Sequence, residues 1–263
     1  MANQLMIVGG GKMGEALTAG LVNAEWAEIG DITVVEPIGE RREALKKIYS
    51  GLRVVAEPEL SDDVLLAVKP SNIQQACEEL ASCSPKRIIS IAAGVTTTTL
   101  EKLLPPEISV IRVMPNTPAM VNVGMSVLSA GSYSTDDDLD WASSIFASVG
   151  KTTIVDEVHL NAVTGLSGSG PAYVFALAEA MIAAGLNEGL DKETSNLLAT
   201  QTILGAAILM EKTRETPREL RDAVTSPNGT TAAALSIFED NSFSEIIIEA
   251  ISAATSRSAE LGS

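Results

Sequence analysis

Short apolar runs alternate with helical segments through the first half of the chain, and this alternation is the strongest constraint on its fold. Runs of nearly continuous apolar character are typical of parallel strands that are buried on both faces. The predicted strands are residues 5–8, 32–35, 53–55, 64–68, 87–91 and 108–113. The helices predicted between them are residues 14–24, 40–48, 72–81 and 97–103. Alternation at this spacing predicts an α/β fold with a doubly wound sheet.

The alternating pattern continues to about residue 155. Two further strands, at 126–129 and 152–155, are expected at the edge of the sheet and flank a helix at 135–148. That helix begins with Thr-Asp-Asp-Asp. We interpret this start as a threonine cap with acidic residues in the first turn, and not as a metal site.

The second half of the chain is predicted to be entirely helical. Its candidate helices are residues 172–184, 192–212, 217–224, 230–239 and 244–261. Some of them, such as 173–178 and 204–210, are apolar nearly all round, and a helix without a polar face must be buried. A segment of this length cannot bury so many helices alone. We therefore predict an all-α domain at 156–263 that forms an obligate dimer with a second copy.

A glycine-rich loop directly follows the first predicted strand. Residues 9–14 are Gly-Gly-Gly-Lys-Met-Gly, which matches G-x-G-x-x-G at the start of a predicted helix, the context in which this pattern predicts dinucleotide binding. Gly9 permits the tight turn, Gly11 lets the backbone approach a pyrophosphate, and Gly14 permits close packing of helix on strand. The helix N-terminus supplies N–H donors for the phosphates. Residues 1–155 are therefore predicted to form a Rossmann-type dinucleotide-binding domain.

The residue that ends the second strand is expected to meet the adenosine ribose of the cofactor. It is Glu36, and an acid there accepts hydrogen bonds from the ribose hydroxyls and disfavours a 2′-phosphate. Arg41 and Arg42 follow closely and could offer that phosphate a cation. The choice between NADH and NADPH is left open by this pattern.

Composition excludes several classes of function. The net charge is −16, with 34 acidic against 18 basic residues, so we predict no nucleic-acid partner. The uncharged stretches 113–135 and 160–178 contain Pro, Gly, Asn and Ser, so we predict no membrane span. No basic signal-peptide region precedes the first strand, and Cys77 and Cys83 are expected to be structural thiols. These features favour a cytoplasmic protein.

Few residues are candidates for acid–base or metal chemistry. The single histidine, His159, is expected at the surface, and no metal site is predicted. The Gly-x-Ser-x-Gly nucleophile elbow is absent from the sequence. A nicotinamide site without an obvious acid–base pair suits hydride transfer to a small molecule that is already electrophilic, such as a protonated imine.

Two polar loops in the second half precede predicted helices. Residues 164–173 place glycines and hydroxyls before a helix that starts at Pro171, and residues 225–231 form a similar loop. Hydroxyls and free N–H groups at a helix N-terminus suit a carboxylate. Ordinary helix capping is the alternative for each loop.

Five motifs occur in order along the chain. They are the loop at 9–14, Ala-Val-Lys-Pro at 67–70, Ala-Ala-Gly at 92–94, Met-Pro-Asn-Thr-Pro at 114–118 and Gly-Leu-Ser-Gly-Ser-Gly-Pro-Ala-Tyr at 165–173. Together they resemble the motifs of the pyrroline-5-carboxylate reductase family. The stretch 217–239 is the most specific, since it has Val-Thr-Ser at 224–226 and Asn-Gly at 228–229 at the family's spacing.

The resemblance implies reduction of 1-pyrroline-5-carboxylate to L-proline by NADPH or NADH, the last step of proline biosynthesis. It implies a homodimer through the helical domain, and larger rings of dimers such as a decamer. The implied cofactor contacts are Gly9, Gly10, Gly11, Lys12, Met13, Gly14, Glu36, Ala67, Val68, Lys69, Pro70, Ala92, Ala93 and Gly94. The implied contacts of the substrate carboxylate are Ser226, Gly229, Thr230 and Thr231.

Three residues are expected to serve catalysis on the basis of the resemblance. They are Thr231, Glu157, which matches a position close to the ring nitrogen of the substrate, and Thr164, which starts the loop that lines the pocket. Two positions depart from the family's pattern. Ala223 stands where some relatives have an asparagine near the cofactor, and Glu36 replaces a small polar residue that is frequent in members preferring NADPH.

Two other classes of protein remain as alternatives. The first is another two-domain imine or β-hydroxyacid reductase. Such enzymes usually carry a catalytic lysine on a helix of the second domain, whereas Lys192 and Lys212 lie at predicted helix ends. The second is a nucleotide-sensing Rossmann protein without turnover, which would have no need of the carboxylate loop at 225–231.

Overall fold

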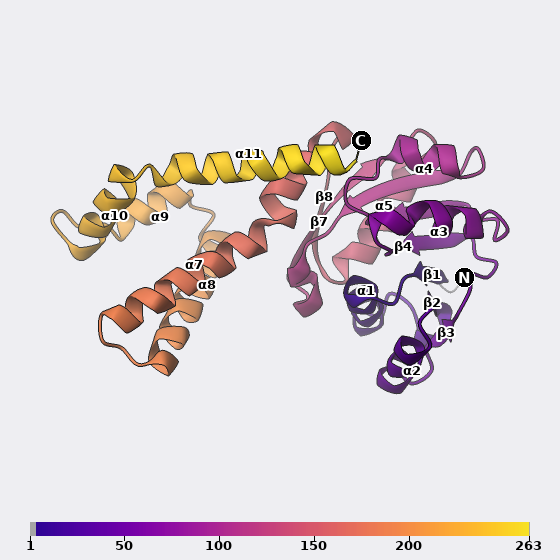
Figure 1. The fold of residues 1–263 in the computed structure, drawn as a ribbon, viewed down its shortest axis with the longest axis horizontal. Helices are drawn as coiled ribbons and strands as arrows, with labels where there is room; N and C mark the ends of the chain where they lie inside the picture. Colours follow the sequence, from indigo (N-terminus) through magenta and orange to yellow (C-terminus); the bar gives the residue numbers. More distant parts are fainter. Residues whose placement is uncertain (1–3, 263) are drawn as a thin grey trace. The chain divides into compact units, whose positions relative to one another are not determined.

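The computed structural model describes residues 4–262 and divides them into two compact units (Figure 1). The first unit contains an eight-stranded sheet in the order β3-β2-β1-β4-β5-β6-β7-β8. The strands are β1 Leu5–Val8, β2 Ile32–Val35, β3 Arg53–Val55, β4 Asp63–Leu66, β5 Arg87–Ser90, β6 Ser109–Met114, β7 Gly124–Ala130 and β8 Gly150–Ile154. The strand order reverses between β1 and β4, as in a doubly wound sheet. The predicted fold class is therefore confirmed.

Helices cover both faces of this sheet. Helices α1 Lys12–Asn23, α2 Gly39–Ile48 and α5 Asp136–Ala147 contribute to one apolar core, and α3 Ile73–Leu80 and α4 Thr97–Leu103 contribute to the other. Four short 3₁₀ turns connect these elements: η1 Ile29–Asp31, η2 Pro70–Asn72, η3 Thr117–Val121 and η4 Glu157–His159. Both cysteines are buried free thiols, as expected.

Strand β7 differs from its expected place. It pairs antiparallel with β6 and parallel with β8, so the prediction that residues 126–129 form an edge strand is wrong. Residues 126–129 are all buried, as an inner strand requires. The helix that follows begins as predicted, because Thr135 and Asp138 form a capping box at the start of α5.

The second unit is helical and has almost no core of its own. Its helices are α7 Gly170–Asn187, α8 Lys192–Thr213, α9 Pro217–Ala223, α10 Thr230–Asp240 and the first part of α11 Phe243–Leu261. Of the residues described from 170 to 251, Ser195 and Ala199 alone are buried. Large apolar side chains are correspondingly exposed, with Phe175 at 63% and Leu197 at 66%.

The segment between the sheet and α7 was predicted to end in a loop, but it is helical. Helix α6 Leu160–Val163 continues into a π-helical turn, η5 Thr164–Gly168. Gly168 packs closely on the turn after β6, since a Cβ there would lie 2.6 Å from the Met114 side chain. By length and composition alone, the helical stretch Glu157–Asn187 also contains a segment that is long and apolar enough to cross a membrane.

The compact units do not divide at residue 155. The first unit keeps residues 156–169 and includes the end of α11 from residue 252 together with Gly262. Side-chain contacts account for this division, because Ser258 Oγ donates to Asn161 Oδ1 at 2.9 Å and Glu157 is bound to β6 and α4.

Candidate active site

The glycine loop has the geometry that a bound pyrophosphate requires. Gly9 has a φ of +114°, and a Cβ there would lie 2.6 Å from the Ala67 carbonyl oxygen. Gly11 is the N-cap of α1 and has no side chain to occupy the first N–H groups. A Cβ on Gly11 would meet nothing within 4 Å, so the backbone is open there. Lys12, Met13 and Gly14 form the first turn of the helix. These residues therefore fit a dinucleotide phosphate.

Glu36 directly follows β2 beside this loop and is 7% exposed. Its Oε2 accepts a hydrogen bond from the Gly10 N–H at 3.1 Å, and its Oε1 accepts one from the Ile38 N–H at 2.9 Å. The carboxylate is thus fixed at the carboxyl end of the strand, where ribose hydroxyls would meet it.

The two arginines that follow are engaged by the protein. Arg41 Nε donates to the Gly10 carbonyl at 2.7 Å, and its guanidinium pairs with Glu15. Arg42 Nη1 donates to the carbonyls of Glu36 at 2.9 Å and Pro37 at 2.7 Å. Both guanidinium groups donate hydrogen bonds to backbone carbonyls near Glu36. Neither group is therefore positioned solely to bind a 2′-phosphate.

The two other predicted cofactor loops lie at the carboxyl ends of neighbouring strands. Residues Ala67, Val68, Lys69 and Pro70 follow β4, and Ala92, Ala93 and Gly94 follow β5. The Ala67 N–H donates to the Val8 carbonyl at 2.8 Å, which joins this loop to the end of β1. The glycine loop and both of these loops thus stand at the sheet edge where doubly wound folds bind their ligands.

The loop after β5 is packed against the last turn of α11. Gly94 has a φ of +81°, and a Cβ there would lie 3.1 Å from the Gly262 backbone nitrogen. This backbone-to-backbone contact leaves no room for a side chain.

An ion pair between a buried arginine and a partly exposed glutamate lies beside the same loop. Glu157 Oε1 accepts hydrogen bonds from the Thr97 N–H at 2.8 Å and from Arg112 Nη1 at 3.1 Å. Its Oε2 accepts one from Thr97 Oγ1 at 2.6 Å. Arg112 is 3% exposed, and its Nη2 has no hydrogen-bond partner among the described residues. Both oxygens of Glu157 are therefore used within the protein.

Sequence reasoning gave Thr97 and Arg112 no role. An arginine inside an otherwise apolar strand is the one signal that could have found this cluster, because buried arginines are nearly always paired.

The turn after β6 is joined to the π-helical turn. Asn116 Oδ1 accepts from the Met125 N–H at 2.9 Å, and Asn116 Nδ2 donates to the carbonyl and the hydroxyl of Ser167, each at 3.3 Å. Thr164 begins the π-helical turn, and its hydroxyl donates to the Leu160 carbonyl at 2.8 Å. The motif at 114–118 thus supports the segment that contains Thr164.

The predicted carboxylate contacts lie together in the second unit, at the start of α10. Gly229 is the N-cap, so no side chain caps this helix, and Thr230 and Thr231 occupy its first turn. The Gly229 N–H donates to the Ser226 carbonyl at 3.0 Å, which closes a tight turn. Thr231 is therefore not the capping residue, and the first N–H groups remain available to an anion.

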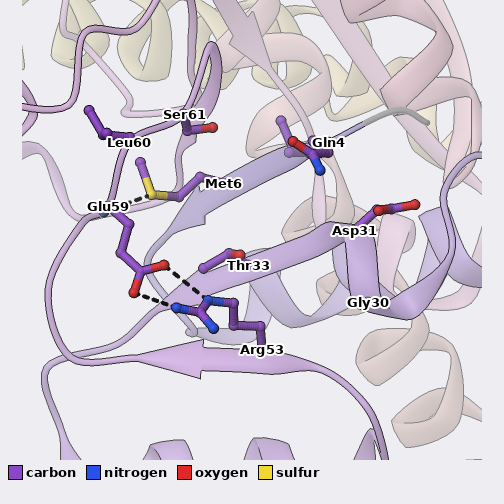
Figure 2. A pocket seen from close by; sticks show the side chains of 10 residues that line it. Gln4, Met6, Gly30, Asp31, Thr33, Arg53, Glu59, Leu60 and Ser61 are labelled. Atoms are coloured by element: carbon purple, nitrogen blue, oxygen red, sulfur yellow. Dashed lines mark hydrogen bonds and ion pairs between the residues drawn. The ribbon is translucent and has the colours of Figure 1, made fainter. Parts of the chain in front are cut away.

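A separate hollow of about 170 Å³ lies at the opposite end of the strands (Figure 2). It is lined by residues that precede or begin β1 to β4, including Arg53 and Glu59, which form two hydrogen bonds at 3.0 and 2.7 Å. It contains none of the predicted site residues.

The strand order and the open glycine loop define a dinucleotide-binding protein with a Rossmann-type fold. A family model described as NADP oxidoreductase coenzyme F420-dependent matches residues 4–94, and one described as pyrroline-5-carboxylate reductase dimerisation matches residues 157–261. A pyrroline-5-carboxylate reductase of Synechocystis sp. is 42% identical, over 100% of this chain and 99% of the relative. The chain belongs to the pyrroline-5-carboxylate reductase family.

Solved structures agree with this assignment. A pyrroline-5-carboxylate reductase from Coxiella burnetii has a TM-score of 0.93 and 35% identity, over 100% of both chains. A pyrroline carboxylate reductase from Plasmodium falciparum, solved with NADP bound, has a TM-score of 0.88 and 30% identity, also over 100% of both chains.

Proposed function

We propose that this protein reduces 1-pyrroline-5-carboxylate to L-proline with NADPH or NADH. The observation that carries the proposal is full-length similarity to pyrroline-5-carboxylate reductases, together with an open glycine loop on β1 and an uncapped, hydroxyl-bearing start of α10. A reductase of this kind oxidises NADPH or NADH in the last step of proline biosynthesis, so this step depends on the redox state of the nicotinamide pool.

The first unit holds the cofactor. The N–H groups at the start of α1 bind the pyrophosphate, and Glu36 accepts from the ribose. The loops at 67–70 and 92–94 flank the dinucleotide. When bound, NAD(P)H supplies the hydride, and no residue of the chain has to form a covalent bond to the substrate.

The start of α10 holds the substrate carboxylate. Ser226, Thr230 and Thr231 contribute hydroxyls, and the backbone at Gly229 and beyond contributes N–H donors. Fixing the carboxylate fixes the orientation of the ring, whose imine is electrophilic once protonated. Catalysis then rests mainly on positioning, to which Thr164 contributes through the π-helical turn.

The assembly we propose is a homodimer through the helical unit, with a decamer as the larger form. The family model for dimerisation covers residues 157–261, and the exposed apolar side chains of this unit need a partner surface. We assign the apolar stretch 157–187 to this self-association and not to a membrane. The free, buried cysteines agree with a cytoplasmic location, and the net charge of −16 opposes nucleic-acid binding.

Thr231→Ala tests the carboxylate site. We expect the KM for the imine to rise roughly tenfold, because a hydrogen bond to a charged group contributes about 1.5–3 kcal/mol. The KM for NADH should barely move. Steady-state kinetics with pyrroline-5-carboxylate, run with NADPH and NADH side by side, provides the measurement.

Thr216→Ala is the matched control, since Thr216 caps α9 through its hydroxyl. Loss of this cap should lower the melting temperature without changing the KM for the imine. A Thr231→Ala variant that behaves like the control, with lower stability and an unchanged KM, would place the carboxylate elsewhere.

A further inference from the structure

The hydrogen bonds of Glu157 join two segments that the proposed function assigns to the active site. Thr97 is the first residue of α4 and directly follows the loop that contains Ala92 and Gly94. Glu157 begins η4, the start of the helical segment that leads to Thr164. The two residues lie 60 positions apart in the chain, so this contact sets the relative position of two otherwise independent segments.

The hydrogen bonds of Glu157 to Arg112 and Thr97 are strengthened by the charge of its carboxylate. Arg112 is 3% exposed, and Glu157 is the acidic side chain that pairs with it. A buried arginine without its carboxylate is costly, so Glu157 is strongly held on Arg112. Its other oxygen accepts from Thr97 Oγ1 at 2.6 Å, in the range of strong charge-assisted hydrogen bonds. Glu157 is thus anchored to β6 and α4 by three hydrogen bonds, while a quarter of its side chain remains exposed.

We propose that Glu157 is a positioning residue that holds the start of α4, and with it the 92–96 loop, in the geometry required for cofactor binding. This role rests on the proposed function, in which the 92–94 loop flanks the dinucleotide. It differs from the expectation, based on the resemblance, that Glu157 lies close to the ring nitrogen. If Glu157 is a positioning residue, activity depends on its three hydrogen bonds. If Glu157 acts beside the ring nitrogen of the substrate, activity depends on its negative charge.

Glu157→Gln separates these roles. The amide oxygen can accept from the Thr97 N–H and from Arg112, and the amide N–H can donate to Thr97 Oγ1, so all three contacts survive while the charge is lost. Glu157→Ala removes the contacts and the charge together. Thr97→Val removes one hydrogen bond, leaves the ion pair with Arg112 in place, and is nearly isosteric.

The experiment measures kcat, the KM for NADH and for the imine, and the dissociation constant for NADH by fluorescence titration of the full-length protein. We expect Glu157→Ala to weaken NADH binding and to lower kcat by between about 10- and 100-fold. Glu157→Gln should change both by about threefold or less, and Thr97→Val should fall between the two. The KM for the imine should stay within about threefold in all three variants, since the start of α10 is untouched.

Asp156→Ala is the matched control, because this exposed carboxylate precedes Glu157 and makes no side-chain capping bond. It should match the wild type. A large loss of kcat in Glu157→Gln with normal NADH binding would overturn the proposal in favour of a chemical role. Unchanged NADH binding in Thr97→Val would also overturn it, and this variant provides the test if Glu157→Ala does not fold. The NADH titration needs no imine, so failure of the substrate assignment alone would leave its outcome intact.

Discussion

The carboxylate of Glu36 binds the backbone of the glycine loop and, in the proposed complex, also contacts the cofactor. It accepts hydrogen bonds from the backbone of Gly10 and Ile38, so it shapes the glycine loop before any cofactor binds. In the proposed complex it also accepts from the ribose, and it repels a 2′-phosphate. Arg41 and Arg42 brace the same backbone, so their charges partly offset that repulsion. We therefore expect this single residue to influence both the affinity for the cofactor and the choice of cofactor.

Glu36→Ser should shift the preference towards NADPH. Removal of one carboxylate beside a phosphate is worth on the order of 1 kcal/mol, or about fivefold in the ratio of kcat/KM values. The efficiency with both cofactors should fall, because the Gly10 N–H loses its acceptor, so the ratio is the informative quantity. Glu40→Ser, at an exposed acid in the first turn of α2, should leave the ratio unchanged. An unchanged ratio in Glu36→Ser would show that this carboxylate does not contact the ribose.

Secondary structure elements were predictable wherever the signal is local. Strands β1, β2 and β3 have the predicted bounds, because continuous apolar runs bounded by polar turns leave little choice. The glycine loop was predictable because its function resides in the backbone of consecutive residues. The π-helical turn was missed, since Gly165, Gly168 and Gly170 favour a loop unless packing is known.

In the cluster around Glu157, a local pattern marks Arg112 alone, as an arginine inside an apolar strand, and does not identify its partners. The partners of Glu157 come from α4 and β6, at separations of 60 and 45 residues. The pattern of apolar and polar residues within one segment gives no information about contacts with residues so far away in the chain. The last turn of α11 is a similar case, because its contact with Gly94 depends on the path of the whole chain.

The last turn of α11 is expected to support the 92–94 loop. Gly262→Val should displace this turn, since its backbone packs directly on Gly94. We expect the KM for NADH to rise by about three- to tenfold, with a smaller change in the KM for the imine. Glu260→Ala is the control, because Glu260 is exposed in the same turn and pairs with Arg257. If Gly262→Val and Glu260→Ala have the same KM for NADH, the contact with Gly94 has no role in cofactor binding.

At the scale of the whole molecule, the two units differ in how they are stabilised. The first unit has an apolar core on each face of its sheet. The second has long helices whose large apolar side chains remain accessible, Phe175 and Leu197 among them. A monomer with this surface would be aggregation-prone, whereas a two-fold dimer would bury it. Folding of the helical unit and association are therefore expected to be one event.

Leu197→Glu tests this coupling in the full-length protein. Leu197 is 66% exposed on α8, so the substitution should be harmless in an isolated chain. In a two-fold dimer each protomer would place one glutamate in the interface. Each unpaired buried charge lowers the stability of the dimer by several kcal/mol. We expect sedimentation to show loss of the dimer by two or more orders of magnitude in affinity, with loss of reductase activity. Leu60→Glu, at an exposed leucine of the first unit, should remain dimeric and active. A Leu197→Glu protein that remains a stable, active dimer would exclude this face of α8 from the interface and would require that the apolar surface of the unit be covered through its other helices.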